Sequence, residues 1–319
     1  MLLCINCGLI GLKVTNVRLP EEVLFGVDGL AGRHGLSRSE VVRQALVVYL
    51  HLVENVGTML RPVSFRVKPV QIGSLRRGDV SVLTIPTGHA VVVGSTSSGG
   101  IGAKPLDVLR VEGHVLGRFL ARVALMDVLA TGAFPVLVSV TLGVEKMPSG
   151  NEILAGVKGE VRVVGLDPGQ AVMERFEENF GSVQTGAGLT VVGFANEDEL
   201  RLGKTKPGDL VVAVGLPRVG EEVLSAEAKG EIVDLRNVLT LCQQSFVHDV
   251  FPVGGLGIGY EARMMAFGVG RQLEFEKSEL DLVKSAGPAT VVLVSMDPDK
   301  LGDLGLIVRK PLTVVGRVL

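Results

Sequence analysis

The chain has 319 residues, of which 47% are hydrophobic, 42 are glycine and none is tryptophan. This composition excludes a disordered chain and predicts an α/β protein with valine- and leucine-rich strands and tight turns. The formal net charge of −2 excludes a protein that binds polyanions over its whole surface, and no apolar run is long enough to span a membrane.

The apolar N-terminal stretch, residues 1–12, predicts neither a leader nor a metal site. It has no basic n-region and no cleavage-like motif, so we expect a cytoplasmic protein without a membrane partner. Cys4 and Cys7 form a CxxC pair. A zinc site needs further ligands, and no second CxxC or Cys/His pair follows nearby.

Residues 12–55 have the pattern of one strand followed by two helices. After a short strand, Pro20 opens a helix whose first turn carries two glutamates, which is favourable against the helix dipole. Gly35 ends this helix. Ser37 and Glu40 have the spacing of a capping box, so a second helix is expected to begin there.

Two segments of this unit, VRLPEEV at 17–23 and GLSRSEVVRQAL at 35–46, resemble the ribbon-helix-helix family of DNA-binding domains. The resemblance implies a dimer in which two strands pair into a ribbon that reads the major groove of duplex DNA. It also implies that the N-termini of the second helices hold phosphates. The DNA-binding residues implied are Lys13, Asn16, Arg18, Ser37 and Ser39, with Lys13 joining them if the strand bulges.

A second interpretation of this unit is dimerisation alone. Residues 1–60 carry five basic and five acidic side chains, so the unit has no net charge that attracts DNA. The alternation of polar and apolar residues in the strand also breaks at Asn16. At the level of sequence both interpretations stay open.

From residue 61 a basic, proline-containing linker leads into a larger body in which strands and helices alternate. The expected strands cover residues 80–85, 90–94, 108–111, 135–144, 189–194, 210–214, 272–276, 289–295 and 311–318. The expected helices cover residues 114–131, 168–177, 221–229, 238–245, a segment ending at 266 and a segment near 280–285, and a helix-to-strand segment covers 152–164.

The stretch from residue 95 to 136 combines the residue types that phosphoryl transfer from ATP requires. Its glycine-rich turn leaves backbone N–H groups open to a phosphate, Lys104 can supply a positive charge, and Asp107 and Asp127 can hold a hard cation. Asp127 lies on an apolar helix, where an acid is costly unless it faces a cleft, a cation or a partner. A flexible turn and a solvated loop pair are the alternatives for the turn and for Lys104 with Asp107. The turn residues are Ser97, Ser98, Gly99, Gly100 and Gly102.

Three segments resemble the aminoimidazole ribotide synthetase superfamily, which includes thiamine-monophosphate kinase, selenophosphate synthetase and the hydrogenase-maturation dehydratase. They are SSGGIG at 97–102, the Lys104 and Asp107 that follow, and ARVALMDVLATGA at 121–133. A further block at 178–188 resembles the loop before a strand in the alpha-ribazole kinase branch, to which the chain is most similar.

The resemblance implies an α/β fold with a two-subdomain body that binds ATP and Mg²⁺ and forms a homodimer through paired sheets. It implies catalytic roles for Lys104 and Asp107, nucleotide binding by the turn with Lys104, and metal binding by Asp107 and Asp127. The residues that it implies for substrate binding are Glu178, Asn179, Gln184 and Thr185. The alternative for these residues is a surface loop rich in helix-capping side chains. His248 and Asp249, which precede the glycine-rich segment 254–259, resemble the second-subdomain motif.

The predicted organisation is a ribbon-helix-helix unit at 1–57, followed by synthetase-like subdomains at 58–200 and 201–319. The expected function is that of a small-molecule kinase resembling alpha-ribazole kinase, which takes part in cobamide assembly. The branch usually carries an aspartate where this chain has Thr96. The alternative is therefore a transcriptional regulator whose body senses a nucleoside-like effector or ATP without turnover.

Overall fold

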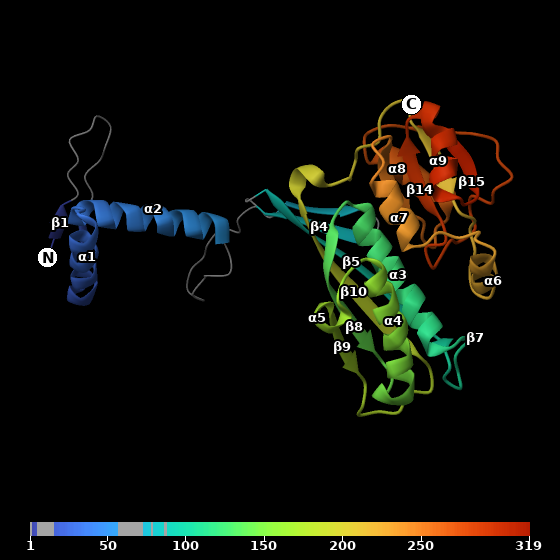
Figure 1. Cartoon of the computed structure of the whole chain (residues 1–319), viewed down its shortest axis with the longest axis horizontal. Helices are drawn as coiled ribbons and strands as arrows, with labels where there is room; N and C mark the ends of the chain where they lie inside the picture. Colours follow the sequence, from blue (N-terminus) through green and yellow to red (C-terminus); the bar gives the residue numbers. More distant parts are fainter. Residues whose placement is uncertain (1, 5–15, 57–72, 78, 86–87) are drawn as a thin grey trace. The chain divides into compact units, whose positions relative to one another are not determined.

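The computed structural model describes residues 2–4, 16–56, 73–77, 79–85 and 88–319, and Figure 1 shows the course of the chain. The chain divides into two compact units, residues 1–72 and 73–319. Most of the predicted linker lies outside the described residues, and the predicted domain boundaries stay predictions. None of the described helices combines the length and the hydropathy required to cross a membrane.

The first unit consists of a two-stranded ribbon and two helices. Strands β1 (Leu2–Cys4) and β2 (Asn16–Arg18) are antiparallel. Helix α1 (Glu21–His34) ends at Gly35, whose φ of 65° is a left-handed conformation that glycine adopts without strain. Helix α2 (Arg38–Val56) follows directly.

The predicted capping box at the start of α2 is present. The Glu40 amide donates to Ser37 Oγ at 3.3 Å, and the Ser37 amide donates to Glu40 Oε2 at 2.8 Å. Two of the backbone N–H groups at this helix start are thus satisfied within the chain. The start of α2 was therefore predictable from the spacing of two residues.

The hydrophobic core of the first unit is small. Leu24 and Val27 of α1 pack against Val41 and Val42 of α2. Other apolar side chains of these helices are exposed, namely Val23, Leu30 and Val48. A core of this size does not stabilise a domain alone, so these exposed side chains are available to a second copy of the unit.

The first sheet of the second unit has six strands in the order β3-β4-β5-β10-β8-β9. Neighbouring strands are antiparallel except β8 and β9, which are parallel. The strands are β3 (Gly73–Arg77), β4 (Val80–Ile85), β5 (His89–Gly99), β8 (Phe134–Leu142), β9 (Val172–Phe176) and β10 (Gly186–Asn196). A separate short ladder joins β6 (Ile101–Gly102) to β7 (Leu109–Arg110).

Helices α3 (Gly113–Ala130) and α4 (Asn151–Val163) lie over this sheet and against each other (Figure 1). Their close approach depends on two glycines. A Cβ added at Gly117 would lie 1.8 Å from the Ile153 carbonyl oxygen, and one at Gly156 would lie 2.0 Å from the His114 carbonyl oxygen. Only glycine fits at these two positions.

The second sheet has five antiparallel strands in the order β12-β14-β11-β15-β13. They are β11 (Leu210–Val214), β12 (Val247–Pro252), β13 (Leu273–Phe275), β14 (Val292–Met296) and β15 (Leu312–Val318). The helices that accompany this sheet are α6 (Glu222–Ala228), α7 (Leu235–Cys242), α8 (Ile258–Phe267) and α9 (Leu301–Val308).

Both faces of the second sheet are buried, as the central strand β11 shows. Leu210, Val212 and Val214 belong to the core cluster that contains side chains of α7 and α9. Val211 and Ala213 belong to the cluster on the α8 side. The first of these clusters also contains the apolar face of α3, which contacts α7 and β12. Helix α3 therefore links the two sheets through one continuous core.

Several predicted elements differ in the structure. The helix predicted over 168–177 is helical only in α5 (Pro168–Ala171), because the next residues form β9 and pair with β8. No helix forms near 280–285, where the chain makes bends. Strand β12 and helix α9 were not predicted, and β5 is longer than expected, extending through Gly99.

Candidate functional site

Three acidic side chains from distant parts of the second unit gather at one place. Asp127 lies near the end of α3, Asp79 lies just before β4, and Glu261 lies in the first turn of α8. Asp127 is only 8% exposed, and its Oδ2 has no hydrogen-bond partner among the described residues. A buried, unpaired carboxylate oxygen is unfavourable unless a ligand satisfies it.

The electrostatics of this cluster favour a cation. Burial, with the nearby charges of Asp79 and Glu261, raises the pKa of Asp127 to about 8. Burial and the charge of Asp79 raise the pKa of Glu261 to about 7. The carboxyl groups of Asp127 and Glu261 therefore tend to hold protons near neutral pH unless a positive charge replaces them. Carboxylate oxygens are the ligands that Mg²⁺ prefers, so the donor type of these residues fits the predicted metal.

Two cavities meet at Asp79 and Asp127, and Glu261 lines the larger of them. The smaller, of about 430 Å³, and the larger, of about 670 Å³, share Asp79, Asp127, Gly254 and Gly255 among their lining residues. A Cβ added at Gly254 would lie 3.9 Å from both Asp79 Oδ2 and Glu261 Oε1, so the glycine keeps the space between the acids open. A group bound at the junction is accessible from both cavities.

The serines of the predicted glycine-rich turn belong to strand β5 and line the smaller cavity with Thr96. The ladder between β4 and β5 ends at Val80↔Gly94, whereas the ladder with β10 continues to Gly99. Beyond Gly94, β5 is thus paired along one edge only. Alternate backbone groups on the other edge are available to a ligand.

The glycines of the turn are explained by packing. Gly100 donates its amide to the Thr185 carbonyl at 2.9 Å and has a φ of 70°. A Cβ added at Gly102 would lie 2.5 Å from Thr185 Oγ1 and 2.9 Å from Asp107 Oδ2. The space that a phosphate would need beside Gly102 is therefore filled by the chain itself, and Gly99 is the last residue of β5.

Asp107 braces the loop that follows the turn. Its buried carboxylate accepts hydrogen bonds from the Thr185 amide and hydroxyl, both at 2.7 Å, and from the Lys104 amide at 2.8 Å. Burial opposes ionisation of Asp107, but these hydrogen bonds outweigh it and hold the pKa of the carboxyl below its usual value. Asp107 lines neither cavity, and its metal-binding and catalytic roles stay predictions.

Lys104 forms an ion pair with Glu145, at the start of the segment that leads into α4. Burial of Glu145 is outweighed by hydrogen bonds from Lys104 and Ser149, which lower the pKa of Glu145 to about 2. Like Asp107, Lys104 lines neither cavity. The structure therefore separates Lys104 and Asp107 from Asp127, with which they were predicted to act.

The predicted substrate-binding residues lie on the loop between β9 and β10. Glu178 and Asn179 are exposed, and the Asn179 amide donates to Glu177 Oε1 at 2.8 Å. Gln184 Nε2 donates to the Leu106 carbonyl at 2.9 Å, and Thr185 is the partner of Asp107. None of the four lines either of these two cavities, and their substrate role stays a prediction.

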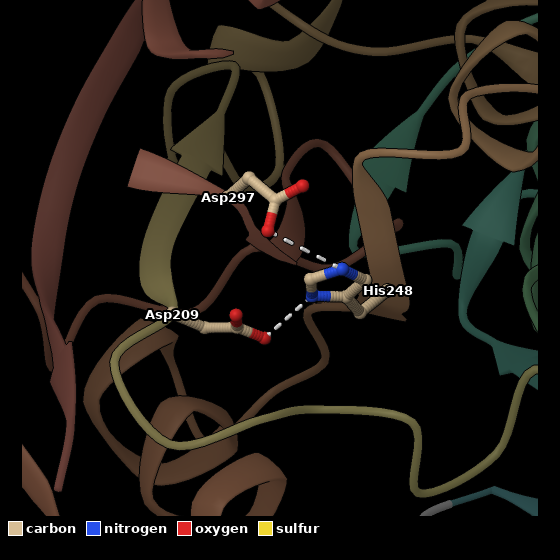
Figure 2. A group of neighbouring side chains, drawn as sticks. All are labelled: Asp209, His248 and Asp297. Carbon is tan, nitrogen blue, oxygen red and sulfur yellow. Dashed lines mark hydrogen bonds and ion pairs between the residues drawn. The ribbon is translucent and has the colours of Figure 1, made fainter. Parts of the chain in front are cut away.

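The second-subdomain residues His248 and Asp249 belong to β12 and are buried. Figure 2 shows the His248 ring between two carboxylates, with Nδ1 2.8 Å from Asp209 Oδ2 and Nε2 3.6 Å from Asp297 Oδ1. Lys206 Nζ lies 2.9 Å from Nε2. Because an ammonium group only donates, Nε2 accepts, and the ring proton is on Nδ1 facing Asp209.

The three side chains of Figure 2 could together hold a metal ion. In this structure Lys206 already supplies a positive charge at His248 Nε2, so the polar network is closed without an ion. Asp249 also has hydrogen-bond partners within the chain, because its Oδ2 accepts from the Gly203 amide and the Thr205 hydroxyl, both at 3.1 Å. We interpret the network around His248 and Asp249 as structural support for β12.

The residues predicted to contact DNA are placed only in part. Lys13 and the side chain of Asn16 lie outside the described residues, whereas Arg18 is exposed at the end of β2. Ser37 is exposed, and its amide donates to Glu40 Oε2; its contact with a DNA phosphate stays a prediction. Ser39 is in the first turn of α2, where amides have no partner within the helix.

Two members of the acidic cluster were missed at the level of sequence. Asp79 comes between β3 and β4, where a polar residue is ordinary, and Glu261 stands where an acid is expected from the helix dipole. Each therefore has an ordinary local explanation. The only sequence signal was the acid on the apolar face of α3, which identified Asp127 alone.

Comparison with protein families supports the assignment of the first unit. The family model described as ribbon-helix-helix protein, copG family, matches residues 13–51. A search of curated proteins found no match.

Solved structures with a similar fold cover most of the chain at low sequence identity. Thiamine monophosphate kinase from Aquifex aeolicus has a TM-score of 0.54 and 14% identity, covering 74% of this chain and 87% of that chain. AaThiL complexed with AMPPCP and TMP has a TM-score of 0.53 and 14% identity, covering 75% and 84%. PurL of T. maritima complexed with AMPPCP has a TM-score of 0.52 and 16% identity, covering 75% of this chain and 42% of that chain. The body therefore has the predicted aminoimidazole ribotide synthetase-like fold.

Proposed function

We propose that residues 73–319 bind ATP with Mg²⁺ and transfer its γ-phosphate to a small molecule. One observation carries this proposal, namely the buried, unpaired Asp127 carboxylate beside Asp79 and Glu261 at the junction of two cavities. Proteins of the same fold, AaThiL and PurL of T. maritima, were solved with the ATP analogue AMPPCP.

In this proposal Asp79, Asp127 and Glu261 hold Mg²⁺ and, through it, the phosphates of the nucleotide. Phosphoryl transfer depends mainly on positioning and on neutralising charge, which a cation between carboxylates supplies. Ser97 and Ser98 line the smaller cavity together with Asp79 and Asp127, where they can contact the transferred phosphate. The ion pair of Lys104 and the hydrogen bonds of Asp107 hold the neighbouring loop in place.

The finer assignment, an alpha-ribazole kinase in cobamide biosynthesis, rests on the sequence resemblance of residues 97–133 and 178–188 alone. It is tested with alpha-ribazole and ATP as substrates.

The second candidate is a regulator that binds nucleotide without turnover. Two observations favour it: Thr96 lines the smaller cavity where the alpha-ribazole kinase branch usually has an aspartate, and the chain carries a ribbon-helix-helix segment. We propose that this segment dimerises and binds duplex DNA in either case.

Calorimetric titration with Mg²⁺-AMPPCP tests the proposed site. Asp127→Asn removes one of the clustered charges, so the affinity should fall at least tenfold, or about 1.4 kcal/mol. Asp198→Asn is the matched control, because Asp198 is exposed and lines neither cavity. Equal affinity in Asp127→Asn and the unmodified protein would remove the acidic cluster as the nucleotide site.

A further inference from the structure

Helix α6 closes one side of the smaller cavity. Val219, Val223 and Leu224, in this helix or just before it, line the cavity, and the facing wall includes side chains of α3. Figure 1 shows α6 at the end of two connecting segments that project from the second sheet. Because the same cavity contains Asp79 and Asp127, α6 borders the route to these carboxylates from this side.

The segment that carries α6 is anchored at both ends. The Arg218 amide donates to Thr290 Oγ1, and the Val233 amide donates to the Thr290 carbonyl oxygen, both at 3.1 Å. Between these anchors, Gly220 and Gly230 bracket α6 with φ of 63° and 72°, and no atom lies within 4 Å of a Cβ added at either. The backbone can therefore turn at the two glycines without a side-chain clash.

The apolar contact between α6 and α3 is small and separate from the core. Val223 and Ala226 of α6 pack with Phe119 of α3 and with Ile232 in a cluster of their own. None of these four residues belongs to the two larger clusters that hold the sheets of the body. Helix α6 can therefore leave α3 while both larger clusters stay packed.

One carboxylate fastens α6 to α3. Glu227 accepts hydrogen bonds from Arg118 Nη1 and Nη2, both at 2.7 Å, and from Arg122 Nη1 at 2.8 Å. Burial opposes ionisation of Glu227, but the hydrogen bonds and charges of the two arginines hold its pKa below the usual value. A guanidinium group joined to a carboxylate by two bonds is a strong pair with a defined geometry.

Release of Glu227 leaves no buried charge without a partner. Arg122 is 5% exposed, but it also pairs with Glu160 of α4, with Nη2 2.8 Å from Oε1. Arg118 and Glu227 are 30% and 25% exposed, so water hydrates both when they separate. Breaking a buried ion pair is costly because one charge stays uncompensated, and Glu160 removes that cost for Arg122.

We propose that α6 is a lid, latched to α3 by Glu227, and that its opening admits small molecules to the smaller cavity. On opening, the chain turns at Gly220 and Gly230, and Val223 and Ala226 leave Phe119. The anchored ends of the segment stay in place. The inference goes beyond the proposed function, because it concerns access to the cavity and holds for whichever molecule binds there.

Thiol labelling with N-ethylmaleimide measures the opening in the full-length protein. Ala226 is 2% exposed and lines neither cavity, so in Ala226→Cys the reagent reaches the introduced thiol only when α6 leaves α3. Adding Glu227→Gln should raise the labelling rate roughly tenfold or more, because a charge-assisted pair contributes more than the ~1.4 kcal/mol that corresponds to a factor of ten. Arg118→Gln should act in the same direction. Peptide mass spectrometry distinguishes position 226 from the three native cysteines.

Two controls separate lid opening from general loosening of the body. Glu231→Gln removes a carboxylate that pairs with Arg218 of the same segment, so it should change the rate at position 226 little. Val238→Cys places a thiol at a fully buried position of α7, and its rate should not respond to Glu227→Gln. An unchanged rate at position 226 in both Glu227→Gln and Arg118→Gln would overturn the proposal. An equal rise at positions 226 and 238 would overturn it too, because the whole body would then be opening.

Discussion

Asp127 is a residue whose burial opposes its own charge. With its pKa raised to about 8, above the 3.8 of an ordinary aspartate, the folded protein keeps a proton that the unfolded chain releases. Between pH 4 and pH 8 the unfolded state binds fewer protons at this residue, so the free energy of unfolding falls as pH rises through this range. A bound cation would offset the free-energy cost of burying the ionised Asp127 carboxylate, and we propose that the functional protein binds such a cation.

This argument predicts that Asp127→Asn stabilises the metal-free protein. At pH 8 the gain should be roughly 1–3 kcal/mol, since each unit of pKa difference corresponds to ~1.4 kcal/mol and burial of the amide offsets part of the gain. At pH 4, where the folded protein keeps Asp127 protonated, the gain should be absent and the variant should be no more stable than the unmodified protein. Denaturant unfolding at the two pH values, with EDTA present, checks the prediction. A variant less stable than the unmodified protein at pH 8 would contradict the raised pKa.

A substitution at Thr96 distinguishes the proposed kinase from the proposed regulator. Thr96 is half-buried and lines the smaller cavity with Asp79 and Asp127. If it stands in place of a metal ligand, phosphoryl transfer by the unmodified protein should be slow, and Thr96→Asp should raise the rate by restoring a carboxylate. Single-turnover assays with ATP and alpha-ribazole measure this. Rapid transfer by the unmodified protein would show that the existing carboxylates suffice.

At the scale of secondary-structure elements, the packing of α3 on α4 rests on two glycines. Gly117→Ala would place a methyl group 1.8 Å from the Ile153 carbonyl oxygen, so one helix must move. We expect a loss of roughly 2–4 kcal/mol in the free energy of unfolding. Gly159→Ala is the matched control, because no atom lies within 4 Å of its added Cβ, and this change should be neutral or stabilising by about 1 kcal/mol. Equal stability of the two variants would show that α3 and α4 do not pack this closely.

The elements differ in how far the sequence predicts them. Strands β4 and β15 and helix α3 were predictable within a few residues because their apolar residues recur at a single period, and β11 because it is one unbroken apolar run. Strand β9 was not, because Pro168 signals a helix start and only pairing with β8 makes the following residues extended. Strand β12 was missed because its buried His248 and Asp249 interrupt the apolar run, and their partners come from distant segments.

The acidic site shows the same limit. Asp127 was predictable because an acid on an apolar helix needs a reason. Asp79 and Glu261 come close to Asp127 only in the tertiary fold, where the residue before β4 and the first turn of α8 meet at the end of α3. The catalytic roles of Lys104 and Asp107 stay predictions, and their partners Glu145 and Thr185 could not be inferred from spacing along the chain.

At the scale of the whole molecule, a ribbon-helix-helix segment precedes a body of aminoimidazole ribotide synthetase-like fold. The first unit leaves much of α2 uncovered, with Leu46, Val47, Val48, Tyr49 and Leu50 all exposed. A dimer of this unit would bury such side chains. If the body also dimerises, as the sequence resemblance implies, one two-fold axis can serve both units. Ligand binding in the body and DNA binding at the N-terminus would then occur in the same dimer.

The last prediction is that full-length protein binds duplex DNA as a dimer through the outward side chains of β2. Arg38 is held by Asp28 across the two helices, so it is not available to DNA, and Arg18 becomes the main described basic contact of the ribbon. Arg18→Ala should weaken binding by roughly 1–3 kcal/mol and relax sequence preference, as loss of a base contact does. Because phosphate contacts release counterions, affinity should also fall steeply as salt rises.

Arg33→Ala is the control for this prediction, because Arg33 is an exposed basic residue in the last turn of α1, away from the ribbon. It should change affinity little and leave sequence preference intact. Gel-shift titrations over the DNA upstream of the protein's own coding region, at several salt concentrations, measure all three proteins. If the dimeric protein shifts no fragment at low salt, the N-terminal unit serves dimerisation alone. The regulator proposal then fails, while the nucleotide site on the body is unaffected.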